Sequence, residues 1–170
     1  MARLRLLLPL LAVTLGSCSY VYDLKAVVIG GRLAFVVDPK SRNVASCLNA
    51  IDVIASGEVK AKAAPGDDVS RVRYGTFWHE RLDYGCADKF PIFYGQRFKG
   101  KRGPSGQAIK VVAAKPLRIG IVYEVSTTTG TGGYGGGAFK IMPDHTVSNL
   151  PRTPMVDSDD AVNSAIANGS

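Results

Sequence analysis

The strongest constraint on the fold is an alternation of side chains that begins at Tyr20. Every second residue from Tyr20 to Val28 is aromatic or aliphatic, which is the period of a strand with one buried face. Gly30-Gly31 follows, and a second apolar run occupies 32–37. Glycine adopts the positive φ angles of tight hairpin turns, so the sequence predicts a β-hairpin over 20–37.

The rest of the chain repeats this pattern of short apolar runs separated by turn residues. We expect further strands over 47–55, 69–78, 89–94, 107–114, 119–128 and 136–142. Evenly spread short strands indicate an all-β domain. The prediction is a single antiparallel β-sandwich over residues 18–142.

The composition changes after Met142. Residues 143–157 contain three prolines and few apolar side chains, which is typical of an extended or partly disordered segment. Acidic residues near Ser158 and the Asn168-Gly169 pair are typical of the two ends of a helix. We therefore expect a flexible tail over 143–170, with a short helix over 158–167 as one of its forms.

The motifs that resemble catalytic or nucleotide sites are all incomplete. A glycine-rich stretch reads Gly130-Thr131-Gly132-Gly133-Tyr134-Gly135, but the helix that a dinucleotide site needs does not follow it. We expect a flexible hairpin loop there, with Tyr134 exposed. His79-Glu80 resembles the start of a zinc-protease motif whose second histidine is replaced by Asp83. The sequence therefore predicts no enzyme activity, no metal site and no cofactor.

The first seventeen residues have the order of a secretory signal peptide. Arg3 and Arg5 precede the uncharged, leucine-rich run 6–15, and the small residues Gly16 and Ser17 follow. A membrane-spanning helix needs about 20 apolar residues, so this run is too short for one. A buried helix is the other alternative, but the run lacks a polar face.

The segment Leu15-Gly16-Ser17-Cys18 resembles the lipobox of bacterial lipoproteins. The resemblance implies cleavage before Cys18 and attachment of lipid chains to it, which anchor the protein in a membrane. Two or more fatty chains hold a protein stably on a bilayer. In that family an aspartate after the cysteine favours the inner membrane, so Ser19 implies the periplasmic face of the outer membrane. Cleavage without lipidation, giving a soluble periplasmic protein, is the alternative.

The other two cysteines of the chain are Cys47 and Cys86. In an exported protein the oxidising environment favours a disulfide. Neither cysteine has the close neighbour that a zinc site requires. We predict a Cys47–Cys86 disulfide, which would close a loop of about 40 residues and stabilise the fold by about 4 kcal/mol in the chain-entropy model.

The segment Leu117-x-x-Gly120-x-x-Tyr123 resembles the tyrosine corner of immunoglobulin-like and fibronectin-like domains. In those domains a tyrosine at the start of a strand bonds back to the preceding turn. The resemblance implies an immunoglobulin-like sandwich. A tyrosine in any buried strand is an equally good interpretation.

The chain has a formal net charge of +7, and residues 89–118 contain eight basic side chains and no acid. Nucleic acid is one partner that such charge suggests, but the export signal argues against it. A solvated, solubilising loop is the other interpretation. The binding hypothesis is that four basic residues contact an anionic component of the cell envelope: Arg97, Lys99, Lys101 and Arg102.

The expected function is that of a lipid-anchored envelope protein, a periplasmic binding or scaffolding module. A periplasmic hydrolase with an unrecognised site and a subunit of an envelope assembly are the alternatives. The partners that we expect are the membrane, through Cys18, and an anionic component or a protein of the envelope.

Overall fold

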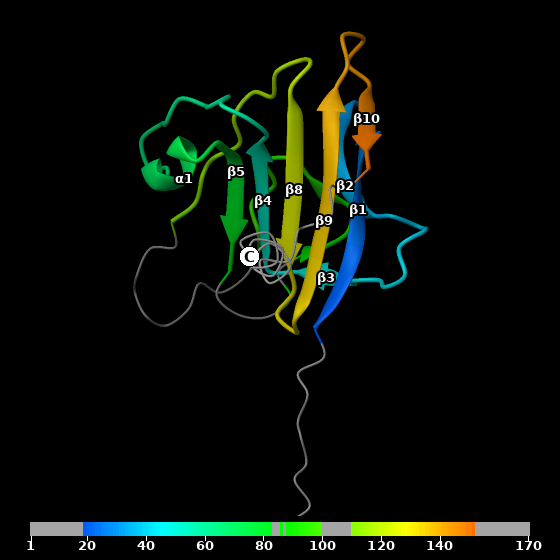
Figure 1. The fold of residues 1–170 in the computed structure, drawn as a ribbon. Coiled ribbons are helices and arrows are strands. Elements are labelled where there is room, and N and C mark those ends of the chain that lie inside the picture. The colour runs from blue at the N-terminus through cyan, green and yellow to red at the C-terminus, as the bar shows by residue number, and fades with distance from the viewer. Residues whose placement is uncertain (1–18, 83–85, 87, 100–109, 152–170) are drawn as a thin grey trace, which may run out of the picture.

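The computed structural model describes residues 19–82, 86, 88–99 and 110–151. This part of the chain is mostly β-strand, as Figure 1 shows, and its main sheet is strongly curled and open. The all-β prediction is therefore confirmed. The elements, in chain order, are β1 Tyr20–Ile29, β2 Arg32–Val37, β3 Cys47–Leu48, β4 Ala50–Ala55, α1 Val69–Arg73, β5 Thr76–Arg81, β6 Asp88–Lys89, β7 Ile92–Phe93, β8 Val122–Thr128, β9 Gly133–Ile141 and β10 Val147–Leu150.

The main sheet has the strand order β5-β4-β8-β9-β1-β2-β7, and β10 pairs with β9 beside this path. A separate pair, β3-β6, forms a two-stranded sheet. Most neighbours are antiparallel, but β1 and β9 are parallel over Tyr20–Asp23. The prediction of a purely antiparallel sheet is therefore wrong for this pair. Its two strands belong to opposite ends of the chain, so no hairpin forces them to run in opposite directions.

The predicted hairpin over 20–37 is confirmed. Strands β1 and β2 pair from Leu24–Val37 to Ile29–Arg32. Gly30 and Gly31 form the turn with φ angles of 56° and 75°. Both values lie in the left-handed region, where residues with a Cβ atom are strained.

The strand predicted over 69–78 is wrong in its first half. Val69–Arg73 forms α1, and only the later residues enter β5. The side chain of Asp68 accepts hydrogen bonds from the backbone N–H groups of Ser70 and Arg71. These are the contacts of a helix N-cap, and they outweigh the alternating pattern of the segment.

The strand predicted over 107–114 is mostly not formed in its described part. Val112 exchanges two backbone hydrogen bonds with His79 on the outer side of β5. The backbone N–H of Lys115 donates to the carbonyl of Phe77. Residues 110–115 therefore cover the edge of β5 as a short strap, and residues 107–109 lie outside the described part.

Residues 130–132 of the glycine-rich stretch form the expected hairpin turn and Tyr134 is exposed as expected, but residues 133–135 already belong to β9, which corrects the extent of the predicted loop. Gly133 and Gly135 lie on β9 opposite Tyr20 and Tyr22 of β1. A Cβ atom at either glycine would lie less than 3.0 Å from the ring of the opposite tyrosine. The glycines are therefore needed because the tyrosine rings occupy the space above them.

The sheet continues beyond Met142, where the tail was expected to begin. Val147–Leu150 forms β10, which pairs with Ala138–Ile141 of β9. That half of β9 is free for β10 because β1 leaves it after Asp23 and continues with β2. The side-chain amide of Asn149 accepts from the backbone N–H of Ala26 at 2.7 Å and donates to its carbonyl at 2.8 Å. Residues 158–167 lie outside the described part.

Aromatic side chains join the distant strands of the curled sheet around one core. Phe35 of β2 contacts Trp78 of β5 and Phe139 of β9, with ring centroids 6.4 and 5.5 Å apart. Tyr94, which follows β7, packs edge-on against Trp78. Burial raises the pKa of the Tyr94 hydroxyl, so it remains a donor and bonds to the carbonyl of Lys115 at 2.8 Å.

The hydrogen bond expected at Tyr123 is present. Its hydroxyl accepts from the backbone N–H of Arg118, five residues earlier, at 2.8 Å. Tyr123 is fully buried and stacks on Phe139. The bond holds the turn before β8 against the core.

A Gly135→Ala substitution should destabilise the protein by roughly 1–3 kcal/mol, because the new methyl group meets the Tyr22 ring and the Thr127 hydroxyl. Tyr134→Ala is the control, since its side chain lies on the other face of the same strand and is half exposed. It should change stability by no more than about 0.5 kcal/mol. Urea unfolding of both variants measures the difference, and equal midpoints would contradict the packing argument.

Candidate surface-binding site

One row of residues crosses the main sheet at the end where β1 begins. Each member is the register partner of the next across five strands, and we call the set the lower row, because β1 begins at the lower end of the sheet in Figure 1: Val21, Tyr134, Thr128, Ala50 and Arg81. Because each is paired with the next, the first residues of β1 and the last residue of β5 lie at the same end of the sheet.

The predicted disulfide between Cys47 and Cys86 is confirmed, with the two Cα atoms 5.4 Å apart and the two cysteines separated by 39 positions in sequence. Cys47 begins β3, three residues before Ala50 of the lower row. The backbone N–H of Asn49 donates to the carbonyl of Thr128 at 2.8 Å. The disulfide therefore joins Cys86 to β3, close to the lower end of the sheet.

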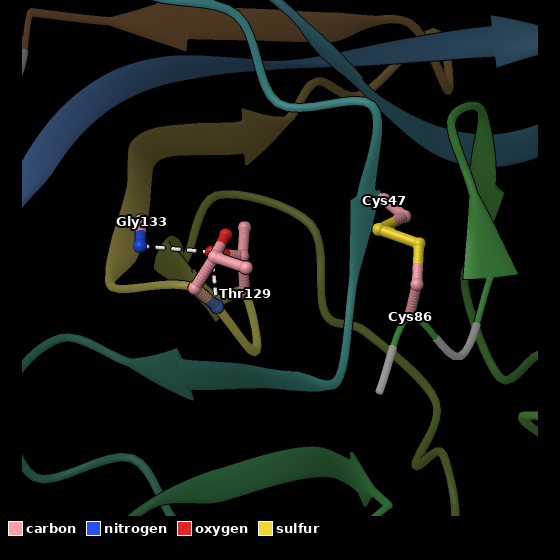
Figure 2. The surroundings of a disulfide bond; sticks show 5 residues. Cys47, Cys86, Thr129 and Gly133 are labelled. Atoms are coloured by element: carbon pink, nitrogen blue, oxygen red, sulfur yellow. Dashed lines mark hydrogen bonds between the residues drawn. A yellow bond between two sulfur atoms is a disulfide. The ribbon is translucent and has the colours of Figure 1, made fainter. Parts of the chain in front are cut away.

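The β8–β9 turn closes this end, as Figure 2 shows beside the disulfide. The Thr129 hydroxyl accepts the backbone N–H of Gly133 at 2.8 Å. Tyr20 donates its own N–H to the carbonyl of Gly132 at 3.2 Å. The start of β1 is therefore hydrogen-bonded to the turn, so the residue after Ser19 is already part of the folded sheet.

The structure describes two of the four proposed binding residues, Arg97 and Lys99, while Lys101 and Arg102 lie outside it. The Arg97 guanidinium is 3.4 Å from the Glu80 carboxylate, yet the Arg97 side chain is 63% exposed. The Lys99 backbone N–H donates to Asp88 at 3.4 Å. Both contacts lie near the lower end of the sheet, because Glu80 is the residue before Arg81 and Asp88 is the register partner of Leu48.

Residues 97–99 of the basic segment are attached to the body of the protein, which the sequence does not indicate. Phe98 is buried between the two exposed cations, and the acids that meet them, Glu80 and Asp88, both precede the acid-free run 89–118. A segment without acids in sequence can therefore still have acidic neighbours in space. Besides Arg97 and Lys99, the lower end of the sheet carries the exposed cations Arg81 and Lys89.

Lys115 belongs to the same basic segment but does not reach the surface. Its ammonium group forms an ion pair with Asp67, and both side chains are almost fully buried. Burial alone would raise the pKa of Asp67, but the bond from Lys115 and the backbone N–H groups of Ala64 and Ala113 outweigh it and lower that pKa. Asp67 therefore fastens the strap to the loop before α1.

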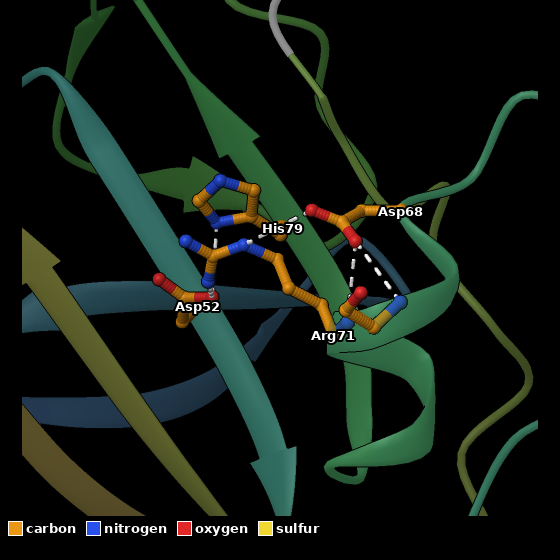
Figure 3. Close-up of polar contacts among 5 residues, drawn as sticks. Asp52, Asp68, Arg71 and His79 are labelled. Atoms are coloured by element: carbon orange, nitrogen blue, oxygen red, sulfur yellow. Dashed lines mark hydrogen bonds and ion pairs between the residues drawn. The ribbon is translucent and has the colours of Figure 1, made fainter.

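A second polar cluster lies on the outer face of the sheet under α1, as Figure 3 shows. Nδ1 of His79 lies 2.9 Å from Oδ1 of Asp52, an ion-pair distance, although its direction does not satisfy hydrogen-bond geometry. Arg71 of α1 donates to the same oxygen at 2.9 Å and lies 3.9 Å from Asp68.

This cluster connects α1 to the sheet. The His79 side chain is only 3% exposed, and the Asp52 side chain is 20% exposed. Within the described residues, histidine, cysteine and carboxylate side chains form no group of three or more that could hold a metal ion. The packing of α1 on the sheet accounts for the positions of these polar side chains.

The comparisons with known proteins add no relative. No family model matches the chain, and neither a curated protein nor a solved structure matches it significantly. Within the described residues, no helix has the length and apolar character required to span a membrane.

Asp67→Asn should destabilise the protein by about 3–5 kcal/mol, because the almost fully buried Lys115 is left charged and unpaired. The folded-state pKa of Asp67 is lowered, so the pair stabilises the protein above the unfolded pKa of about 3.9. This stabilisation is lost as the pH falls through the folded pKa.

Urea unfolding between pH 7 and pH 3 tests this prediction. The exposed Glu58→Gln variant is the control and should keep the acid dependence of the parent. The Asp67→Asn variant should be less stable at pH 7 and lose less stability on acidification. An unchanged acid dependence in that variant would contradict the assignment.

Proposed function

We propose that the chain is a lipid-anchored protein of a bacterial cell envelope. Cys18 carries the lipid, and the domain lies on the periplasmic face of the outer membrane as a binding or scaffolding module. The observation that carries this proposal is the segment Leu15-Gly16-Ser17-Cys18 after a short apolar run. The lipid chains would hold the protein at the bilayer without a membrane-spanning helix.

Two structural features support parts of this proposal. The Cys47–Cys86 disulfide suits an oxidising compartment such as the periplasm. The hydrogen bond from Arg118 to Tyr123 agrees with the proposed immunoglobulin-like sandwich. The curled sheet would then supply two packed faces around the aromatic core.

The proposed partner is an anionic component of the envelope. Arg97 and Lys99 are exposed on either side of the buried Phe98, so their charged ends can reach a surface while their backbone stays fixed. Such contacts weaken as salt screens the charges. Lys101 and Arg102 extend the same run of sequence and complete the proposed site.

Cys18→Ala should abolish incorporation of labelled fatty acid and leave an unprocessed precursor, because the thiol that receives the lipid is gone. The matched control is the Cys47→Ser/Cys86→Ser double variant, which loses the disulfide and keeps Cys18. It should still be labelled. Normal labelling of Cys18→Ala would refute lipidation at this residue.

The soluble form that begins at Ser19 should cosediment with an anionic surface at low salt and be released at high salt. Anionic liposomes and isolated cell wall are the two surfaces to compare. Substitution of Arg97, Lys99, Lys101 and Arg102 by glutamine should remove most of this binding, because each exposed cation near an anionic membrane contributes about 1 kcal/mol.

The control for this experiment is the Lys60→Gln/Lys62→Gln variant, compared with Arg97→Gln/Lys99→Gln at equal change in net charge. Lys60 and Lys62 are exposed and follow β4 at the opposite end of the sheet, where Arg118 donates to the carbonyl of Lys60. If neither surface is bound at low salt, or if the fourfold variant binds like the parent, the basic segment only improves solubility.

A further inference from the structure

The distance between the proposed lipid site and the folded sheet is very short. Cys18 precedes Tyr20, the first residue of β1, by two positions. A fully extended chain advances at most about 3.6 Å per residue, so the two Cα atoms are no more than about 7 Å apart. A linker of this length cannot hold the domain away from the bilayer, and the lower row must lie close to the headgroups.

The part of the lower row nearest to the anchor is apolar and exposed. Val21 and Tyr134 are register partners on the outer face and are 51% and 49% exposed. Val44, 75% exposed, follows Asn43, whose amide donates to the carbonyl of Val21 at 2.8 Å. Tyrosine is enriched where proteins meet the membrane–water interface, because its ring is apolar and its hydroxyl is polar.

The other end of the same row is cationic. Arg81 terminates the row four strands away from Val21, about 19 Å at the usual strand spacing. Exposed Lys89 and Lys99 lie near it, because Lys89 pairs with Cys47 and Lys99 bonds to Asp88. One end of the sheet therefore combines apolar side chains beside the anchor with cations farther away.

We infer that the lower row faces the membrane that holds the anchor, and that the anionic partner is the phospholipid headgroup surface of that membrane. This inference rests on the proposed lipidation of Cys18. Val21 and Tyr134 contact the interfacial region, and the cations face the phosphate groups. A second copy of the chain and a separate acidic partner are the competing occupants.

The test uses the chain that begins at Cys18, produced without residues 1–17 and with Cys47–Cys86 oxidised. Cys18 is then the free thiol, and it can be coupled to a maleimide lipid in vesicles of phosphatidylcholine and phosphatidylglycerol. The acyl chains of part of the phosphatidylcholine carry bromine, which quenches nearby tryptophan. The single native tryptophan, Trp78, is buried and supplies a constant background.

Tyr134→Trp and Ile119→Trp are the matched variants. Ile119 is 48% exposed and lies at the opposite end of the sheet, where it bridges to Ile141. We expect quenching that is several-fold stronger for Tyr134→Trp than for Ile119→Trp. Equal quenching, stronger quenching for Ile119→Trp, or quenching of neither variant would overturn the inference.

The outcome separates this inference from the proposed function, because the coupling is chemical and does not depend on lipidation in cells. Absent labelling of Cys18 in cells would count against the anchor alone. Analytical sedimentation of the soluble form that begins at Ser19 measures its oligomeric state, and it tests whether a second copy of the chain covers the lower row. If it forms dimers that Tyr134→Ser dissociates, the lower row is an interface between copies and the inference is wrong.

Discussion

The close approach of β1 to β9 determines the shape of the sheet. Strand β9 has three neighbours, because it pairs with β8 along most of its length, with β1 at its start and with β10 at its end. Gly133 and Gly135 leave room for the rings of Tyr20 and Tyr22, which pack on the inner face. This packing lets β1 pair with β9 over Tyr20–Asp23, and from Leu24 onward β1 pairs with β2 instead.

Buried polar groups fix the segments that cover the sheet. Asp67 binds Lys115 and two backbone N–H groups, so one carboxylate holds the strap at the edge of β5. Tyr94 bonds to the carbonyl of the same lysine. A buried charge is costly unless it is paired and hydrogen-bonded, and here these partners come from segments far apart in sequence.

The elements that depend on local pattern could be predicted, and those that depend on distant partners could not. Gly30-Gly31 between two alternating runs predicted the first hairpin, and the pair Cys47 and Cys86 predicted the disulfide. Asp68 before α1 is a residue type that favours a helix N-cap, but the alternating pattern of the segment led to the prediction of a strand. The later part of β9 was predicted as a strand over 136–142, but its start at Gly133–Gly135 could not be recognised, because it packs against tyrosines more than 100 residues earlier in the chain.

The candidate site could likewise be predicted only as far as neighbouring residues determine it. The sequence indicated a basic segment, and the structure confirms that Arg97 and Lys99 are exposed. It also places Glu80 beside Arg97, which sequence spacing could not reveal, and brings Asp88, the residue before the segment, against Lys99. The relation between the start of β1 and the end of β5 required the strand register, since Val21 and Arg81 are sixty residues apart in sequence.

The amide of Asn149 has a consequence for the processing of the chain. It occupies a backbone N–H and a backbone carbonyl of Ala26 that would otherwise belong to an open strand edge. A protease that cut the chain between β9 and β10 would expose this edge together with the second half of β9. Exposed strand edges pair with other strands, so trimming at this point would convert a covered edge into a template for aggregation.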